Sequence, residues 1–277
     1  MEQASKKLSF VLSVVAMLAV VGFVFCTNVQ YAEASSVDGN FTVSGPFLTA
    51  GMDTALNTLS ERIAVAENLI NTTLVAPNGS GIPPANFWAP QAAHTALNAS
   101  ITSAKAMVNS VSFKAGDTFD VTVSVAGNTG FAALLLHLQM PDELEVIAVK
   151  QGLAHNGFDV GGTGIEPGDW NYTTGALAKP ISPNIFAGYS PIMAGTSVSN
   201  FTGNGVLFTY TMRVKSGAAA GITEAATVKF SGSQPPYTDN PTKVVGADNL
   251  PLSLTMNGSG ILTPGQVVTL GNVLIVN

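Results

Sequence analysis

The amino-acid sequence predicts a mainly β protein, an antiparallel jelly-roll β-sandwich with an N-terminal α-helical hairpin. From residue 111 to the end, apolar residues recur at every second position in short runs, as in strands with one buried face. Between residues 53 and 110 they recur every three or four positions, as in amphipathic helices. The 28 glycines and 15 prolines among 277 residues also favour short elements joined by frequent turns.

Residues 1–34 have the pattern of a signal peptide. Two lysines precede an apolar run over residues 10–26, and Ala32-Glu33-Ala34 has small residues where signal peptidase needs them. We predict cleavage after Ala34. Because the apolar run is long for a signal peptide, an uncleaved membrane anchor is the alternative. In both cases we expect the rest of the chain to be secreted or displayed at the cell surface.

Composition and charge exclude several classes of function. The formal net charge is -6 and no basic stripe is present, which argues against nucleic-acid binding. The only cysteine, Cys26, lies within the predicted signal peptide, and the bulky Phe25 before it does not fit a lipid-attachment motif. The mature chain therefore has neither disulfides nor cysteine-ligated zinc. This favours a bacterial source.

Residues 35–110 contain the predicted helical hairpin. Asp53 can cap the first helix, and Pro90 can begin the second, because the first turn of a helix does not need that N–H group. A segment rich in proline, glycine and asparagine separates the two helices. The predicted apolar stripes are Leu56, Leu59, Ile63, Ala66 and Ile70 in the first helix, and Leu97, Ile101, Ala104 and Val108 in the second.

The connection between the helices carries a resemblance of its own. Its residues are Asn78-Gly79-Ser80, Ile82-Pro83-Pro84 and Phe87-Trp88, followed by Leu97, Ile101 and Ala104. In this order they resemble the FIVAR-like helical modules of bacterial surface proteins. The third helix of that module is not evident, because strand-like sequence begins at Val111. The helical unit is therefore expected to be incomplete and to pack on the strand-like region after it.

The alternating segments between residues 111 and 277 form the predicted sandwich. Because they alternate and no helix separates them, they indicate antiparallel sheets with one face in water. We also expect strands at residues 144–149, 250–256 and 267–276. The predicted inward-facing sets are Phe119, Val121, Val123 and Val125; Leu134, Leu136, Leu138 and Met140; Val206, Phe208, Tyr210, Met212 and Val214; and Ala226, Val228 and Phe230.

Two separated motifs in this region resemble the pattern of one family. They comprise Gly116-Asp117-Thr118, Gly130, Leu134 to Met140, Leu144-Glu145-Val146 and Gly152, and then the strand from Val206 to Val214 with small residues after it. In this order they resemble the cohesin domain, a sandwich related in architecture to carbohydrate-binding modules. Two departures are Met140-Pro141-Asp142, where cohesins have Tyr-Asp-Pro, and residues 156–202, which match no part of the pattern.

The resemblance implies a protein-binding function. Cohesin modules of scaffoldins bind dockerins through one sheet face, so a dockerin-like protein is the implied partner. The candidate contact residues are Leu135, His137 and Gln139, which alternate with the predicted core residues of their strand. We therefore expect a non-catalytic, exported binding or adhesion protein that takes part in extracellular assembly.

No pattern indicates a catalytic, metal or cofactor site, and we predict that the chain is not an enzyme. The histidines are far apart and lack a His or Glu at metal-ligand spacing. The acidic residues lie at a turn or in a glycine-rich stretch, without the pattern of a calcium loop or a catalytic pair. The residues considered are His94, His137 and His155; Asp142, Glu143 and Glu145; and Asp159, Glu166 and Asp169.

Two other functions remain open. Trp170, Tyr172 and Tyr189 lie in loop-like sequence, where aromatic rings can stack on sugars, so a carbohydrate-binding module that recognises a polysaccharide is one alternative. Packing is the favoured role for Trp170. The low charge and the many strands make a structural subunit of a surface layer or fibre the other alternative.

Overall fold

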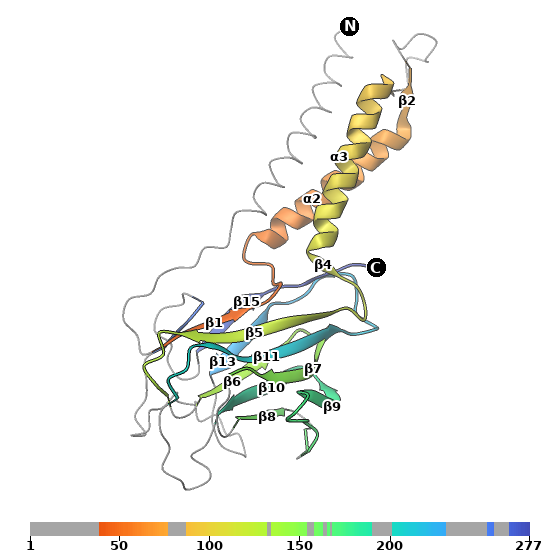
Figure 1. Cartoon of the computed structure of the whole chain (residues 1–277). Helices are drawn as coiled ribbons and strands as arrows, with labels where there is room; N and C mark the ends of the chain where they lie inside the picture. The colour runs from red at the N-terminus through yellow and green to blue at the C-terminus, as the bar shows by residue number, and fades with distance from the viewer. Residues whose placement is uncertain are drawn as a thin grey trace. The chain divides into compact units, whose positions relative to one another are not determined.

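The computed structural model describes residues 39–76, 87–131, 134–153, 158–162, 165–166, 168–189, 201–230, 254–257 and 266–277. The described chain forms two compact units (Figure 1). The helical unit comprises residues 50–112, and the sandwich unit comprises residues 39–49 and the chain after residue 112. The helical unit is therefore inserted into the sequence of the sandwich. The predicted signal peptide lies outside the described residues.

The helical unit is built around two helices, α2 (Met52–Thr72) and α3 (Gln91–Ser110). Between them along the chain, β2 (Thr73–Val75) and β3 (Phe87–Ala89) pair in parallel. The predicted stripes are confirmed, because spacings of three and four residues place apolar side chains on one side of a helix. The buried cluster consists of Leu59, Ile63, Ala66, Leu97, Ile101 and Ala104.

The two helices begin in different ways. The prediction that Asp53 caps α2 is wrong, because the helix begins after Gly51, whose φ of 91° suits glycine. Asp53 lies in the first turn, where its carboxylate accepts a hydrogen bond from the Thr54 N–H at 2.7 Å. A negative charge there is favourable near the helix N-terminus. Pro90 immediately precedes α3, close to its predicted place.

The connecting loop bears on the FIVAR-like resemblance. Residues 78–84 of the motif lie outside the described residues, so that part of the resemblance stays a prediction.

No helix in the described ranges is long and apolar enough to cross a membrane.

The sandwich unit is mainly β and has two principal sheets. The six-stranded sheet has the order β14-β1-β5-β11-β7-β9, and the five-stranded sheet has the order β15-β13-β6-β10-β8. Neighbouring strands in both are antiparallel, except that β1 and β14 are parallel. The first sheet comprises β1 (Gly39–Ser44), β5 (Thr118–Ala126), β7 (Leu144–Gln151), β9 (Ala176–Ile181), β11 (Gly205–Val214) and β14 (Leu254–Met256).

The remaining strands form the second sheet and a small third one. The second sheet comprises β6 (Leu134–Gln139), β8 (Phe158–Gly162), β10 (Asn184–Tyr189), β13 (Ala226–Phe230) and β15 (Val267–Gly271). The third, of order β12-β16-β4, comprises β4 (Ser112–Phe113), β12 (Gly221–Ile222) and β16 (Leu274–Ile275).

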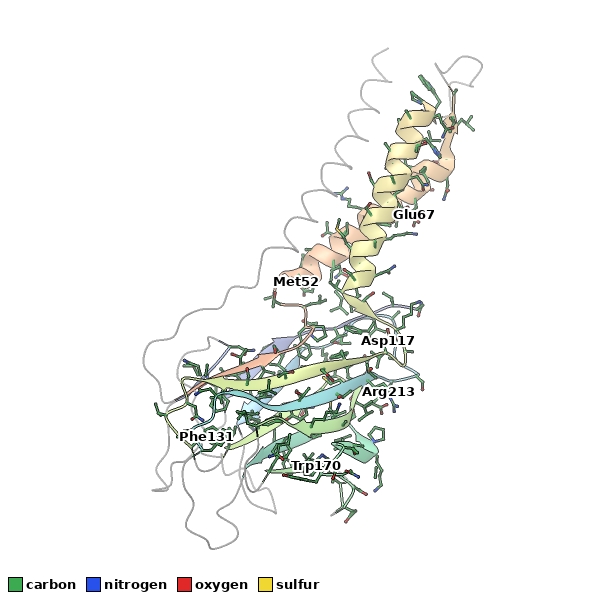
Figure 2. The ribbon with its side chains drawn as sticks, viewed as in Figure 1. Met52, Glu67, Asp117, Phe131, Trp170 and Arg213 are labelled. Atoms are coloured by element: carbon green, nitrogen blue, oxygen red, sulfur yellow. The ribbon has the colours of Figure 1, made fainter. Side chains whose placement is uncertain are left out.

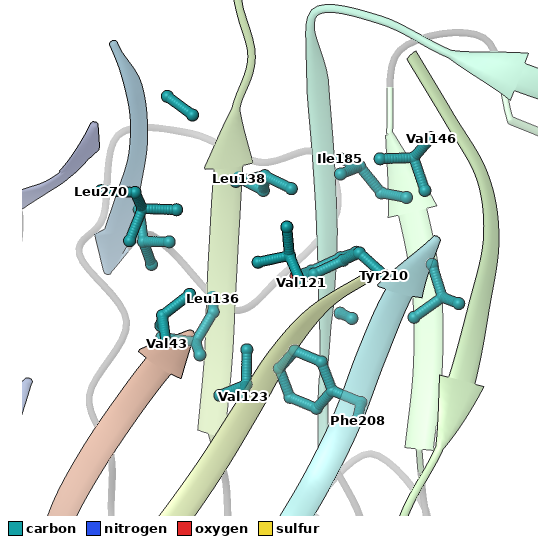
Figure 3. Close-up of a cluster of buried hydrophobic side chains, with 14 of the residues drawn as sticks. Val43, Val121, Val123, Leu136, Leu138, Val146, Ile185, Phe208, Tyr210 and Leu270 are labelled. Carbon is teal, nitrogen blue, oxygen red and sulfur yellow. The ribbon is translucent and has the colours of Figure 1, made fainter. Parts of the chain in front are cut away.

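Both principal sheets contribute side chains to one apolar core (Figure 3). The predicted inward sets of β5 and β6 are confirmed, and Val121, Val123 and Leu138 have no exposed surface. Complete burial of one such side chain is worth about 1.5–3 kcal/mol. The alternation that predicted these faces therefore reflects the main stabilising force of the sandwich.

Strand β11 departs from strict alternation at its start. The sequence predicted that Val206 faces inward, but Val206 is 41% exposed and Leu207 is fully buried. The pairing of β11 with β5 shifts register between Val206 and Phe208, as in a β-bulge. One extra residue reverses the side chains that precede it. From Phe208 to Val214 the predicted inward residues are buried.

Four strands of the two principal sheets were not predicted. β1 precedes the helical unit, yet it pairs with β5 in the sandwich. The stretch from 156 to 202, which matched nothing, contains β8, β9 and β10. These are short strands interrupted by glycine or proline, residues that weaken a strand pattern. These strands are therefore defined by pairing with their neighbours in the sheets, which local sequence patterns do not reveal.

Candidate protein-binding face

The predicted partner residues His137 and Gln139 lie on the outer surface of the five-stranded sheet. We call the outward positions of its strands the β6 face. Strand register places one row of residues across it, Val267, Lys229, His137, Phe186 and Gly161. A second row contains Thr269, Thr227, Gln139 and Asn184. The predicted residues His137 and Gln139 thus occupy the middle strand of this face.

A stacked pair of rings occupies the centre of the β6 face. The imidazole of His137 lies on the ring of Phe186, with centroids 5.4 Å apart and planes 29° apart. Phe186 is 7% exposed and covers Gly161, where an added Cβ would lie 1.9 Å from the ring. Gly161 is therefore required by the close approach of the ring. The ring of Phe186 therefore packs against His137 and restricts the orientation of its imidazole.

The charge on this face comes from Lys229, which neighbours His137 on β13. Burial of the ring, and secondarily the positive charge of Lys229, lower the pKa of His137 below its ordinary value. His137 is therefore neutral at neutral pH. Lys229 is exposed and has no ion-pair partner among the described residues.

Apolar and uncharged polar groups surround this centre. Val267 is 51% exposed, and Gln139, Asn184 and Thr269 are exposed in the second row. Leu135 is in register with Gly188 on the same strand as His137, but its side chain is not among those described. The face therefore combines an apolar group, a cation and two amides that can contact a partner.

The outer surface of the six-stranded sheet, the β5 face, is different in kind. Arg213 donates two hydrogen bonds to one carboxylate oxygen of Glu145, at 2.6 and 2.8 Å (Figure 2). The hydroxyl of Thr211 donates to Asp120 at 2.8 Å, and that of Thr255 donates to Asn40 at 2.6 Å. These side chains therefore pair with one another, whereas Lys150, on the outer side of β7, is exposed and has no ion-pair partner among the described residues.

Two of the three aromatic residues of the alternative site have side chains that the structure describes, Trp170 and Tyr172. The indole N–H of Trp170 donates to the carbonyl oxygen of Val149 at 2.9 Å, and its ring packs on Phe158 (Figure 2). Tyr172 meets Trp170 edge to face and is 61% exposed. Tyr189 lies at the end of β10, and its side chain is not described. Trp170 thus packs, partly buried, against the core of the sandwich.

His94 and Asp169, also considered from sequence, belong to different units of the chain. His94 lies within hydrogen-bond distance of the Ile70 carbonyl oxygen, at 3.3 Å, and His155 is not described. Asp169 accepts the Glu166 N–H at 3.0 Å and lies 3.3 Å from Lys179. These hydrogen bonds, the backbone one first, lower the pKa of Asp169. No three His, Cys, Asp or Glu residues of the described chain could together hold a metal ion.

Sequence reasoning missed Phe186 and Lys229. Phe186 belongs to the glycine-rich stretch in which no strand was predicted. Lys229 could have been predicted from the sequence as an outward residue, because it alternates with the predicted inward residues Ala226, Val228 and Phe230. Its place beside His137, however, depends on the pairing of β13 with β6.

Comparisons with known proteins give similarity only to solved structures. No protein-family model and no curated protein matches the chain. A non-cellulosomal cohesin from Archaeoglobus fulgidus is similar at 17% identity, with 60% of this chain and 87% of that chain covered and a TM-score of 0.32. A cohesin–dockerin complex from Clostridium thermocellum is similar at 17% identity, with 60% and 94% covered and a TM-score of 0.34.

A third similar structure is the solution structure of CaCohA2 from Clostridium acetobutylicum. Its identity is 18%, the similarity covers 54% of this chain and 87% of that chain, and the TM-score is 0.31. A function for this chain therefore has to come from its own residues.

Proposed function

We propose that this chain is a non-catalytic, exported protein that binds a protein partner of the dockerin kind through the β6 face. The observation that carries the proposal is the row of Val267, Lys229 and His137, which offers exposed apolar surface beside a cation that has no ion-pair partner in the described ranges. On the β5 face of the same sandwich, the charge of Arg213 is already paired with Glu145, and the hydroxyl of Thr211 is bonded to Asp120. The two faces thus differ in what they can gain from a partner.

The chemistry of the β6 face fits a protein interface. Protein interfaces combine an apolar or aromatic centre with a polar rim that forms hydrogen bonds. Here the ring of His137 stacks on Phe186, and Gln139 and Asn184 supply amides beside it.

The charge of the face restricts the partner. Lys229 is the cation, and His137 adds no charge at neutral pH because its pKa is lowered. A partner with a carboxylate opposite Lys229 gains a complementary contact, whereas a basic partner is disfavoured. We therefore expect the binding segment of the partner to be apolar and acidic.

The dockerin assignment rests on the cohesin-like motifs, two of whose glycines have structural reasons. Gly116 has a φ of 89°, which glycine adopts without strain. At Gly152, an added Cβ would lie 2.2 Å from the backbone oxygen of Val206, so a side chain cannot fit there. The motif residues Thr118 and Leu144 begin the core strands β5 and β7. The motifs thus coincide with turns and strand entries of the sandwich.

Polysaccharide binding is the second candidate, favoured by the exposed ring of Tyr172 beside Trp170. One exposed ring offers little stacking surface, and the N–H group of Trp170 is already bonded within the fold. Assembly into a surface layer or fibre is a third candidate, for which self-association of the purified chain is the test.

A binding screen tests the proposal. The chain from residue 35 onward is presented in parallel to a panel of dockerin modules, to insoluble polysaccharides and to itself. We expect binding to a dockerin, and a loss of that binding in Lys229→Glu. The matched control is Lys150→Glu, since Lys150 is an exposed lysine on the outer side of β7. Binding that survives Lys229→Glu and fails in Lys150→Glu contradicts the proposed face.

A further inference from the structure

The Asn-x-Ser/Thr sequons of the chain differ in how their side chains are used. Four of them lie entirely within the described residues and begin at Asn40, Asn71, Asn98 and Asn171. N-glycosylation occurs at such sequons, and the acceptor is expected at the surface. A transferase must reach both the amide nitrogen of the asparagine and the hydroxyl two residues later. The structure therefore shows which of the four sequons presents both groups to a transferase in the folded chain.

The two sequons in the helical unit have their hydroxyl groups occupied. Asn71 lies near the end of α2, and the hydroxyl of Thr73 donates to a carbonyl oxygen one turn earlier at 2.6 Å. Asn98 lies inside α3, and the hydroxyl of Ser100 donates in the same way at 3.0 Å. A transferase has to unwind each helix locally before it can use these sites.

The sequon that begins at Asn40 lies in the six-stranded sheet. β1 is paired on one side with β5 and on the other with β14. The side-chain oxygen of Asn40 accepts a hydrogen bond from the hydroxyl of Thr255 at 2.6 Å. The strand would have to leave the sheet for this asparagine to enter a transferase.

Asn171 alone among the four lies in an exposed turn. Its side-chain oxygen accepts hydrogen bonds from the N–H groups of Thr173 and Thr174, both at 2.9 Å. The amide nitrogen of Asn171 and the hydroxyl of Thr173 make no hydrogen bond to the described residues. Asn171, Tyr172 and Thr173 are all exposed. Both groups that the transferase needs are thus available without unfolding.

The chain around this turn is firmly anchored. Trp170, immediately before Asn171, is held by its indole hydrogen bond to Val149 and bridges to Leu177 in β9. The Gly175 N–H donates to the carbonyl oxygen of Asn171 at 2.7 Å, which closes the turn. A glycan attached here would extend from a fixed base without disturbing the core.

We propose that Asn171 is the acceptor of an N-linked glycan. The donor class is a lipid-linked oligosaccharide activated by a phosphate ester at its anomeric carbon. The amide nitrogen of Asn171 forms the bond to the anomeric carbon, the carbon–oxygen bond to phosphate breaks, and the phosphate leaves with the electron pair. One amide proton passes to a base of the transferase. The step depends on export of the chain and not on the β6 face.

The test is peptide mass spectrometry of the full chain purified from its natural source, with Thr173→Val and Thr173→Ser variants expressed there. We expect a glycan on Asn171 at about tenfold or more the occupancy of Asn71 and Asn98, because the helical sites must open first. Thr173→Val removes the hydroxyl and abolishes the modification. Thr173→Ser keeps the sequon and retains it. Both substitutions change an exposed side chain, and thermal melting checks that the fold is unchanged.

A second measurement separates the effect of structure from that of sequence. Synthetic peptides spanning the four sequons are offered, with the folded full chain, to a purified oligosaccharyltransferase and its lipid-linked donor. We expect modification of all four peptides, but of Asn171 predominantly in the folded chain. An unmodified Asn171 in the natural protein, or folded-chain occupancy at Asn71 or Asn98 equal to that at Asn171, overturns the proposal.

Discussion

The two outer faces of the sandwich are built by the same alternation of residues but treat their polar groups differently. On the β5 face, Arg213 bonds to Glu145 and Thr211 bonds to Asp120. On the β6 face, Lys229 has no ion-pair partner in the described chain, and Val267 is 51% exposed. The two centres thus differ: the named polar groups of the β5 face bond to one another, whereas Lys229 lies beside an exposed apolar residue and bonds to no carboxylate of the described chain.

The difference has a physical consequence for binding. A partner that covers the β5 face must remove the paired charges of Arg213 and Glu145 from water, and this desolvation penalty can exceed the Coulombic gain of the pair. A partner that covers the β6 face removes apolar surface from water and can pair with the charge of Lys229. Alternation identifies the outward residues of a strand, but it does not by itself identify a binding surface. The hydrogen bonds and ion pairs of those outward side chains must also be known.

The largest effect is expected when the β6 face is changed at two contact positions together. Val267→Glu with Lys229→Glu replaces an apolar group and a cation with two carboxylates, so an apolar, acidic partner is repelled. We expect affinity to fall by about 100-fold, the scale of an interface hot spot. Isothermal titration calorimetry measures it. The control is Thr209→Glu with Lys150→Glu on the β5 face, and equal losses in the two pairs would contradict the account.

Next in size is the effect of filling the space at Gly161. In Gly161→Ala, the added Cβ meets the Phe186 ring, which must tilt and disturb the stacked His137. We expect unfolding free energy to fall by about 1–3 kcal/mol, as for an overpacked site, with weaker partner binding. Urea denaturation measures the first change. Gly217→Ala is the control, because an added Cβ there meets nothing within 4 Å. Similar losses in both variants would argue against close packing of the Phe186 ring over Gly161.

A smaller effect is expected from opening the network of the β5 face. Glu145→Gln removes the charge that pairs with Arg213, whose side chain is 40% exposed. Because solvent screens this pair, we expect a loss of at most about 1 kcal/mol in unfolding free energy. Partner affinity should not change. A marked loss of affinity without a loss of stability would show that the β5 face makes contact.

The smallest effect concerns the protonation of His137. Its pKa in the folded chain lies below the unfolded value of 6.5, so the unfolded chain binds more protons between the two values. Stability should therefore fall as the pH is lowered through 6.5 toward the folded pKa. Lys229→Met should raise the pKa of His137 but leave it below its ordinary value, because burial is the larger cause. NMR titration of the imidazole measures both, and a pKa unchanged by Lys229→Met would contradict the coupling.

Local patterns made the core of the sandwich predictable. Long strands such as β5 bury every second residue, so their inward faces could be assigned from alternation alone. The helical stripes were predictable from a local pattern of their own, because apolar residues recur there every three or four positions. The bulge at Val206 was not, because an extra residue in one strand is defined by its partner.

The candidate site was only partly predictable. His137 and Gln139 followed from the alternation in β6, but the row that crosses the sheet depends on which strands pair. Phe186 comes from a short strand with glycine nearby, and its stacking on His137 arises from the register of β10. The contrast between the two faces depends on contacts between residues distant in sequence, such as Thr211 and Asp120.

The central claim is that partners bind the β6 face, and hydrogen exchange of the chain with its partner, followed by mass spectrometry, tests it most directly. We predict that the partner slows exchange in β6, β10 and β13 and leaves β1, β5 and β11 unchanged. Slower exchange confined to the β5 face, or to the turn that follows Trp170, would contradict the claim and move the binding surface there.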